Sequence, residues 1–293
     1  MHKIVISLLL ASTACASLRA NPRGLTSAEV LAQAPEFDWE EIPADDLLLA
    51  DTTRGRIVIA LAPEMAVHTV ENVRKLARAH FYDGLAFIRA QEDYVAQWGD
   101  ADGTKPIVDA EKTVKAEFSR TPAGLEFYKL PESDTYAPET GFIRGFPAAR
   151  GHDEAWLVHC YGMVGVGRDE AADSGSGSEL YMVIGHAPRH LDRNVTLIGR
   201  VVEGMSIIST LPRGTAEMGF YATPAERTPL ERVRIVADLP ESERPRYRTL
   251  RSGSTSFADL IESRRNRQDP WTKHPAGKID VCNVPNATQR IDK

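Results

Sequence analysis

The chain has 293 residues, a hydrophobic content of 42% and a formal net charge of −6 at pH 7. This length and hydrophobicity exclude disorder throughout and suffice for one large domain with additional segments or for two small domains. The net charge argues against a general nucleic-acid-binding protein, because such proteins need a basic surface to displace counterions from phosphates. The charge is uneven, since residues 239–293 hold 11 Lys and Arg against 7 Asp and Glu.

The first 20 residues have the pattern of a secretory signal peptide. A positive start with Lys3 precedes a short apolar run and the small residues around Ala14 and Ala16, with a second cleavage position at Ala20. The apolar run is too short to span a bilayer, and no later stretch reaches the roughly 20 apolar residues of a transmembrane helix. An alternative is a lipoprotein box at residues 12–15, in which Cys15 carries a lipid anchor.

Cleavage of the signal would leave two cysteines, Cys160 and Cys282. An oxidising compartment permits a disulfide between them. Cys160 lies in an apolar run at residues 158–161, however, so a buried free cysteine is the favoured interpretation. The sequence contains no CxxC motif or Cys/His cluster with metal-ligand spacing, and we therefore expect no metal site.

The first half of the chain shows one helix pattern beside strand patterns. Residues 21–50 form a polar leader, in which Thr26 and Glu29 have capping-box spacing and predict a short helix. Residues 56–61 are rich in β-branched residues and predict a strand. Apolar residues then recur at helical spacing and predict an amphipathic helix over residues 67–79.

The remaining patterns favour β-structure. Short β-like runs occur at residues 86–90, 94–97, 156–166, 179–184, 195–202 and 230–236. Many short strands with few helices indicate a closed barrel or a sandwich. Residues 119–155 are rich in Pro, Gly and acidic residues and predict a long surface insertion that interrupts the strands. Residues 239–293 form a basic C-terminal extension with few strand signals.

Residues 81–100 carry the most informative pattern. They read F-Y-D-G-L-A-F-I-R-A-Q-E-D-Y-V-A-Q-W-G-D and place Arg89 in an apolar run, eight positions before Gln97. This run resembles, without a gap, the signature of the cyclophilin-type peptidyl-prolyl isomerases, F-Y-[DN]-G-x-x-F-H-R-V-x-x-[GD]-F-[MV]-x-Q-G-G-D. Four further segments resemble other motifs of that family: residues 162–168, 174–181, 190–192 and 197–205.

The resemblance implies a mainly β fold. In that family, a closed antiparallel eight-stranded β-barrel is capped by helices, and residues 51–238 would form it here, with the insertion at about 119–155. The helix over residues 67–79 would supply the first cap. The implied activity is isomerisation of X-Pro bonds in unfolded or partly folded polypeptides, without a cofactor. With the signal pattern, we expect a monomeric protein exported to the bacterial periplasm, with no nucleic-acid partner and no transmembrane segment.

The family's functional residues can be carried over to matching positions. Arg89 would hydrogen-bond the prolyl nitrogen as that atom becomes pyramidal, a role that suits a permanently charged, planar group of donors. Gln97 would hold the substrate backbone and position the arginine, while Tyr94 and Val95 would line the proline pocket. The same comparison implies further substrate contacts at Gly167, Arg168, Glu179, Tyr181, His190 and Leu191.

Several departures from the family pattern keep a second hypothesis open. Glu179 replaces a glutamine, Leu180 and Tyr181 replace a Phe-Phe pair, and Trp98 replaces a glycine. His190 stands for a tryptophan at the rim, or is a solvated loop histidine, and Val195 aligns with a pocket histidine. The alternative is a catalytically weak or inactive cyclophilin-like barrel that binds peptides as a chaperone or envelope scaffold.

Overall fold

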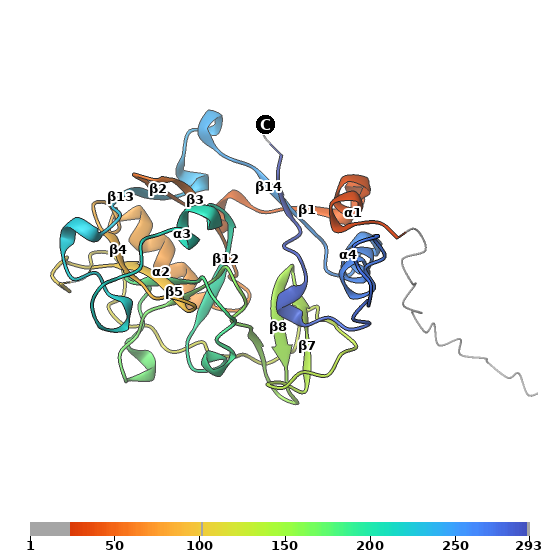
Figure 1. Cartoon of the computed structure of the whole chain (residues 1–293). Coiled ribbons are helices and arrows are strands. Elements are labelled where there is room, and N and C mark those ends of the chain that lie inside the picture. The colour runs from red at the N-terminus through yellow and green to blue at the C-terminus, as the bar shows by residue number, and fades with distance from the viewer. Residues whose placement is uncertain (1–23, 101, 292–293) are drawn as a thin grey trace, which may run out of the picture.

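A computed structural model describes residues 24–100 and 102–291, so the expected signal peptide and Cys15 lie outside the described residues. Within this part of the chain, the largest sheet has eight antiparallel strands in the order β13-β2-β3-β12-β10-β11-β5-β4 (Figure 1). Its strands are β2 (Leu47–Thr52), β3 (Gly55–Leu61), β4 (Ala86–Ala90), β5 (Val95–Gly99), β10 (Met163–Val166), β11 (Leu180–Val183), β12 (Leu197–Glu203) and β13 (Leu230–Ile235).

The two edge strands of this sheet meet. The amide of Phe87 donates to the carbonyl of Thr228 at 2.9 Å, and the amide of Leu230 donates to the carbonyl of Leu85 at 2.8 Å. These bonds join β4 to the start of β13, so the sheet is a nearly closed barrel without two free edges. The prediction of a mainly β, eight-stranded barrel is confirmed.

Helix α2 (Val67–Arg78) forms where the periodicity predicted a helix, and it caps the barrel as the resemblance implied. Its residues Val70, Val73 and Leu76 are fully buried in the same cluster as the barrel interior. The helix has no side-chain cap of its own at Ala66. Instead the Glu117 carboxylate accepts hydrogen bonds from the backbone amides of His68 and Thr69, at 3.0 and 2.8 Å, and supplies negative charge where the helix dipole is positive.

The first barrel strand begins at Leu47, before the expected domain boundary at residue 51. Leu48 and Ala50 face the barrel interior, while Leu47 and Leu49 pack against Tyr247 on the outer face. Because both faces of β2 are covered, its sequence is continuously apolar and lacks the alternation that marks a half-exposed strand. The end of the supposed polar leader is therefore core.

The insertion at residues 119–155 contains regular strands, which its composition did not predict. They contribute to a four-stranded antiparallel sheet, β6-β7-β8-β9, formed by β6 (Tyr128–Lys129), β7 (Glu139–Ile143), β8 (Phe146–Arg150) and β9 (Ala155–Leu157). Phe142, Ala148 and Trp156 of this sheet are buried. The strands were missed because Pro and Gly lie inside or between them and their apolar faces are short.

The leader and the C-terminal extension are also ordered, and they pack together with this sheet. β1 (Trp39–Glu41), β14 (Tyr247–Leu250) and β15 (Thr288–Arg290) form a three-stranded sheet in the order β1-β14-β15. Helix α1 (Ser27–Gln33) lies beside α4 (Thr255–Arg265), next to β7 and β8 (Figure 1). We call residues 24–46, 119–158 and 239–291 together the appended module.

A second apolar cluster holds the appended module together. Phe257 of α4 lies at its centre, with ring centroids 5.0 Å from Phe142 and 5.6 Å from Tyr128. Trp39 and Leu250 join the same cluster, so leader, insertion and extension share one core. The predicted capping box of α1 is confirmed, because Thr26 and Glu29 exchange hydrogen bonds between side chain and backbone. The extension, whose sequence has few strand signals, contributes the two short strands β14 and β15.

Short helices complete the fold. The remaining α-helix is α3 (Met205–Ser209). The 3-10 helices are η1 (Glu36–Asp38), η2 (Ala44–Asp46), η3 (Ala172–Ser174), η4 (Arg189–Leu191), η5 (Glu217–Gly219), η6 (Pro224–Glu226), η7 (Val236–Asp238), η8 (Glu241–Glu243) and η9 (Val281–Asn283). No helix in the described part of the chain combines the length and apolar character needed to cross a membrane.

Cys160 and Cys282 form a disulfide, which corrects the expectation of a buried free cysteine. The bond joins the segment between β9 and β10 to η9 at the end of the appended module. The extension folds back over the insertion, so two cysteines separated by 122 positions lie with their Cα atoms 5.0 Å apart. Burial of Cys160 was predicted correctly, but periodicity carries no information on which distant segment covers it.

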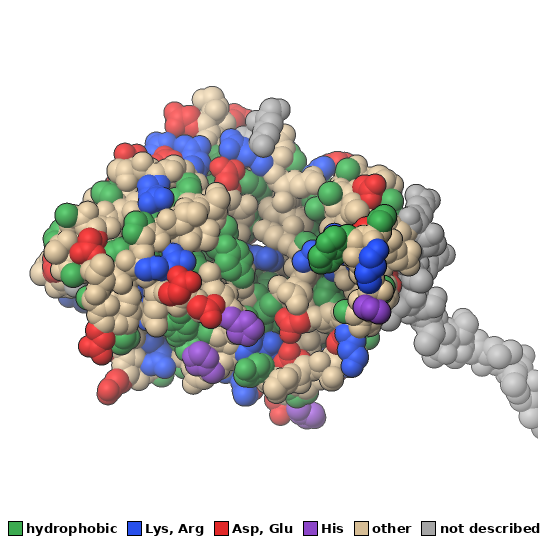
Figure 2. Space-filling model, in the orientation of Figure 1, with side chains coloured by type: hydrophobic (Ala, Val, Ile, Leu, Met, Phe, Trp, Pro, Cys, Tyr) green, Lys and Arg blue, Asp and Glu red, His purple; other side chains and the backbone are tan. Residues whose placement is uncertain are grey.

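The surface in the same orientation mixes both charge signs (Figure 2). Basic and acidic side chains alternate over this face, and a hollow lies where the barrel meets the appended module. Residues of β3, β12 and the β7–β8 turn line a pocket at that junction, including Ala60, Val202 and Phe146. The two parts are therefore joined along a seam that is not completely filled.

Replacing Cys282 with serine is expected to lower the free energy of unfolding by about 2–4 kcal/mol, because the disulfide closes a loop of more than a hundred residues. Urea unfolding followed by circular dichroism measures the change. Reduction of the wild-type protein should give the same loss, and should have no effect on the serine variant. Superimposable unfolding curves for the oxidised wild type and the variant would contradict this expectation.

Candidate functional site

A β-bulge in β4 sets the direction of Arg89. Phe87 pairs with Trp98 and Arg89 pairs with Gln97, so one extra residue, Ile88, lies on β4 between these two pairs. Without the bulge, Phe87 and Arg89 would share one face of the strand, because side chains alternate with a period of two. Phe87 is buried in the barrel interior, and the bulge turns Arg89 to the outer face.

The outer face brings the expected residues into one row across three strands. Arg89 of β4 pairs with Gln97 of β5, and Gln97 pairs with Tyr181 of β11. Residues paired across antiparallel strands have their Cβ atoms about 5 Å apart on the same face. The row opens into a groove of about 890 Å³. The expected site residues that line this groove are Arg89, Tyr94, Val95, Gln97, Gly167, Arg168, Glu179, Tyr181 and Leu191.

The Arg89 guanidinium is half-buried and held on one side. Its Nε donates to the carbonyl of Met218 at 2.7 Å, and its Nη2 donates to the side chain of Gln91. Its carbon Cζ lies 5.5 Å from the ring centroid of Tyr94 and 5.2 Å from that of Phe220. Burial lowers the pKa of Arg89, but an arginine stays charged at any working pH. Nη1 has no hydrogen-bond partner among the residues that the structure describes.

Gln97 contacts Glu179 rather than the arginine. Its Nε2 donates to a carboxylate oxygen of Glu179 at 2.5 Å. Burial raises the pKa of Glu179, and the nearby Asp169 and Asp100 raise it further, against the opposing effect of the hydrogen bond from Gln97. The resemblance implied that Gln97 positions Arg89. In this structure, the contacts of Arg89 come from Gln91 and Met218 instead.

An apolar pocket lies beside this row. Val95, Tyr181 and Val183 form a small buried cluster, and the half-buried Tyr94 and Val195 pack against it. Val195 has no polar group to offer, so the pocket wall that the family builds with a histidine is aliphatic here. This surface is apolar, as a site for a proline ring would need to be.

The rim residues have distinct positions. His190 is exposed in the middle of η4 and stacks on Tyr94, with ring centroids 6.4 Å apart, outside the groove lining. Arg168 is turned toward loop carbonyls: its Nε donates to Asn194 at 2.9 Å and its Nη1 to Asp169 at 2.6 Å. A Cβ at Gly167 would lie 3.2 Å from the Gln97 amide nitrogen, so the backbone approaches the row closely there.

Sequence reasoning missed the segment that covers Arg89. Met218, Phe220 and Tyr221 line the groove and follow a stretch to which we assigned no structure. Phe220 forms an antiparallel bridge with Arg89, and the amide of Tyr221 donates to the carbonyl of Ile88 at 3.0 Å. The aromatic pair after a glycine was the available signal. Nothing local tied it to Arg89, because the contact spans more than a hundred residues.

The groove offers hydrogen-bonding groups but no assembled nucleophile. Ser174 Oγ donates to the carbonyl of Ala171 at 2.6 Å, and Ser178 Oγ accepts from Ser176 Oγ at 3.0 Å, so neither groove serine contacts a histidine. Among residues 24–100 and 102–291, no group of three or more His, Cys, Asp or Glu could hold a metal ion. The arrangement suits non-covalent stabilisation of a polarised amide.

Comparisons with known proteins agree with this geometry. The family model described as cyclophilin type peptidyl-prolyl cis-trans isomerase matches residues 47–237. A probable peptidyl-prolyl cis-trans isomerase of Brucella suis is 26% identical over 171 residues, which are 58% of this chain and 74% of that protein. Peptidyl-prolyl cis-trans isomerase-like 4 of Mycosarcoma maydis is 27% identical over 191 residues, 64% of this chain, but the match spans only 32% of that protein.

A solved structure extends the similarity beyond the barrel. The cyclophilin AquaCyp293 from Hirschia baltica has a TM-score of 0.73 and 27% sequence identity, and the match covers 91% of this chain and 97% of that one. The match therefore includes much of the appended module. The nearly closed barrel, the row of Arg89 and Gln97, and the family match over residues 47–237 lead to one conclusion: this chain belongs to the cyclophilin-type peptidyl-prolyl cis-trans isomerase family.

Proposed function

We propose that this protein is a peptidyl-prolyl cis-trans isomerase that acts on unfolded or partly folded exported proteins. The observation that carries the proposal is Arg89, whose guanidinium is anchored through Nε and Nη2 while Nη1 remains available beside an apolar pocket. The arrangement requires neither a cofactor nor a covalent intermediate.

The chemistry follows from the resonance of the peptide bond. Rotation about it faces a barrier of about 18–20 kcal/mol, and prolyl bonds cross this barrier in tens to hundreds of seconds without help. When the amide twists, resonance is lost and the lone pair becomes localised on the prolyl nitrogen, which can then accept a hydrogen bond. A hydrogen bond from Arg89 to that nitrogen forms only in the twisted state, so it lowers the barrier without stabilising the planar substrate.

In this proposal, the apolar pocket and the row of Arg89 and Gln97 bind different parts of the substrate. Val95, Tyr181 and Val195 would receive the proline ring, while Gln97 and Arg89, which line the same groove, would contact the substrate backbone. Phe220 and Tyr94 pack against the half-buried guanidinium and shield part of it from water, which strengthens its hydrogen bond to the reacting amide.

Two features support export. Residues 1–20 have the pattern of a signal peptide. The disulfide between Cys160 and Cys282 requires an oxidising compartment to persist. Proteins that cross a membrane unfolded must fold afterwards, and prolyl isomerisation is slow enough to limit that step. The bacterial periplasm is the compartment that fits these features.

A binding module without turnover is the second candidate. The hydrogen bond between Gln97 and Glu179 favours this second role, because it occupies the Gln97 side-chain amide that was expected to position Arg89. Peptide binding detected by calorimetry, together with no acceleration of isomerisation, would favour this role as a chaperone or envelope scaffold.

Replacing Arg89 with alanine is expected to lower kcat/KM for a short Ala-Pro peptide by about 10²–10³-fold, the usual cost of removing one donor to a transition state. A protease-coupled assay measures the rate. Arg78→Ala is the matched control, since Arg78 pairs with Asp45 and Asp238 outside the groove lining. Equal rates for Arg89→Ala and the wild type would refute the proposed mechanism.

Replacing Glu179 with glutamine is expected to raise Tm at pH 7. Burial raises the pKa of Glu179 above its usual 4.5, so the neutral acid favours the folded state. That contribution is fully present below pH 4.5 and is lost as pH rises through the folded-state pKa. The gain in Tm should therefore shrink toward pH 4.

Calorimetric scans of this variant between pH 4 and pH 8 measure the effect, with Glu170→Gln as the control at an exposed groove carboxylate. A lower Tm at pH 7, or a difference from wild type that does not change with pH, would contradict the assignment of Glu179 as a destabilising charge.

A further inference from the structure

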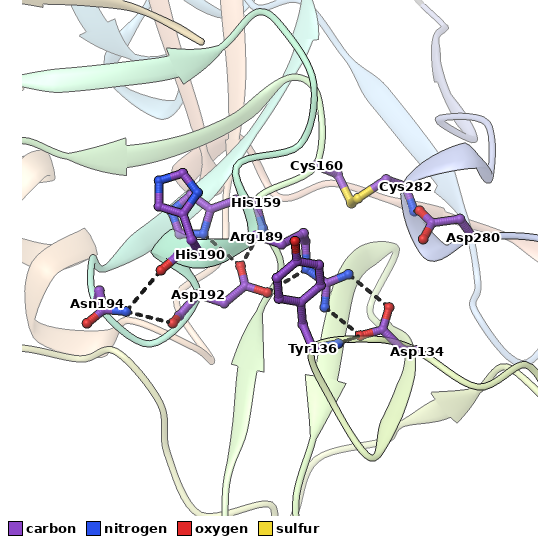
Figure 3. A network of polar contacts seen from close by, with 10 residues as sticks. All are labelled: Asp134, Tyr136, His159, Cys160, Arg189, His190, Asp192, Asn194, Asp280 and Cys282. Carbon is purple, nitrogen blue, oxygen red and sulfur yellow. Dashed lines mark hydrogen bonds and ion pairs between the residues drawn. A yellow bond between two sulfur atoms is a disulfide. The ribbon is translucent and has the colours of Figure 1, made fainter.

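A chain of buried polar side chains runs from the groove into the protein. His159, which is completely buried, lies beside Asp192 (Figure 3) and contacts Tyr181 through its other ring nitrogen. The Tyr181 hydroxyl is 2.7 Å from Nε2 of His159, and Nδ1 is 2.9 Å from Oδ1 of Asp192. His159 does not line the groove and belongs to none of the family motifs found in the sequence.

The carboxylate at the end of this chain fixes the direction of each hydrogen bond. Burial would raise the pKa of Asp192, but hydrogen bonds from His159 and Arg189 outweigh it and leave the pKa below its usual value. Ionised Asp192 can only accept, so Nδ1 of His159 carries the proton and Nε2 is an acceptor. Burial also lowers the pKa of His159, which keeps the ring neutral. The Tyr181 hydroxyl therefore donates to His159.

Arg189 extends the chain into the appended module. Its Nε donates to Asp192 at 2.6 Å, and its Nη1 and Nη2 donate to both oxygens of Asp134 at 3.0 and 2.9 Å. The guanidinium also lies over the Tyr136 ring, 4.9 Å from its centroid (Figure 3). All three charged side chains are almost completely buried. The two-pronged contact with Asp134 orients the arginine as well as binding it.

The other end of the chain is the floor of the proline pocket. The Tyr181 ring lies so close to Gly165 that a Cβ there would be 2.4 Å from its Cζ and hydroxyl oxygen. A buried tyrosine hydroxyl needs a partner, and His159 is the partner here. The position of the ring is thus set on one side by backbone and on the other by a hydrogen bond.

We propose that His159, Asp192, Arg189 and Asp134 form a brace through which the appended module positions Tyr181 at the floor of the substrate groove. These four are positioning residues, since none of them lines the groove. The disulfide supports the brace, because Cys160 follows His159 directly and is tied to Cys282 (Figure 3). The module then contributes to substrate affinity without touching the substrate. This inference rests on the proposed function only in assigning the groove to prolyl peptides.

The chain contains a matched pair of variants for the test. Asp134→Asn removes the charge that orients Arg189, which keeps its second partner, Asp192. Glu132→Gln removes the charge that pairs with Arg265, which keeps its second partner, Glu262. None of these three residues lines the groove. Both positions lie in the insertion, and both substitutions disrupt a buried ion pair there. If the role of Asp134 is purely structural, the two variants should have equal effects on peptide binding.

The dissociation constant for the peptide Ala-Ala-Pro-Phe is the first measurement. We expect Asp134→Asn to raise it roughly three- to tenfold, which lies within the range of coupling along packed networks, and Glu132→Gln to leave it within twofold of wild type. In the isomerase assay, KM should rise in parallel while kcat stays within twofold, because Arg89 is unchanged. If the wild type binds the peptide without turnover, the proposed function fails while the binding comparison still decides this inference.

The state of Tyr181 is the second measurement and needs no substrate. In tyrosine-labelled protein, NMR should detect a slowly exchanging Tyr181 hydroxyl proton in the wild type and in Glu132→Gln, and faster exchange in Asp134→Asn. Tyr181→Phe removes the hydroxyl, so adding Asp134→Asn to it should not weaken binding further. Equal dissociation constants and equal Tyr181 signals in the two insertion variants would overturn the brace.

Discussion

The pairing register of β4, β5 and β11 is the constraint on which the candidate site depends. It aligns Arg89, Gln97 and Tyr181 across three strands, and a single extra residue in β4 turns the arginine out of the barrel. A slip of one residue in β4 would exchange its two faces, so that the guanidinium would be buried in the barrel beside Trp98 and Phe87 would be exposed. Barrel closure prevents that slip, because both edges of the sheet are paired and the aromatic interior fits only one register.

The appended module is held together by contacts between its own distant segments. Its three segments are far apart in sequence and share one apolar core around Phe257. Buried ion pairs and one disulfide cross its seams, notably Arg189 with Asp134 and Arg265 with Glu132. Buried pairs add little net stability, because desolvation offsets attraction, but an unpaired partner would be costly. They therefore specify how the segments dock.

Local patterns predicted several elements of the fold, whereas the closed eight-stranded barrel was implied by the family resemblance. The helical stripe of α2, the capping box of α1 and the strands β3, β11, β12 and β13 follow from periodicity and turn chemistry, which act within a few residues. The strand β2 and the sheet of the insertion did not follow. β2 is covered on both faces and shows no alternation, and the insertion's strands are short and carry Pro and Gly. The apolar partners of the insertion's strands are residues of the distant leader and extension.

The sequence by itself determined the resemblance to the family signature, and this resemblance identifies Arg89 and Gln97 as the residues that we propose to act on a prolyl bond. Only the tertiary structure decided their surroundings. Gln97 meets Glu179 through strand pairing, Phe220 covers Arg89 from a remote loop, and Cys160 finds Cys282 across 122 positions. His159 lies in none of the family motifs, and it meets Asp192 and Tyr181 because three separate segments converge beneath the pocket. Such contacts depend on packing between distant elements, which short-range patterns do not encode.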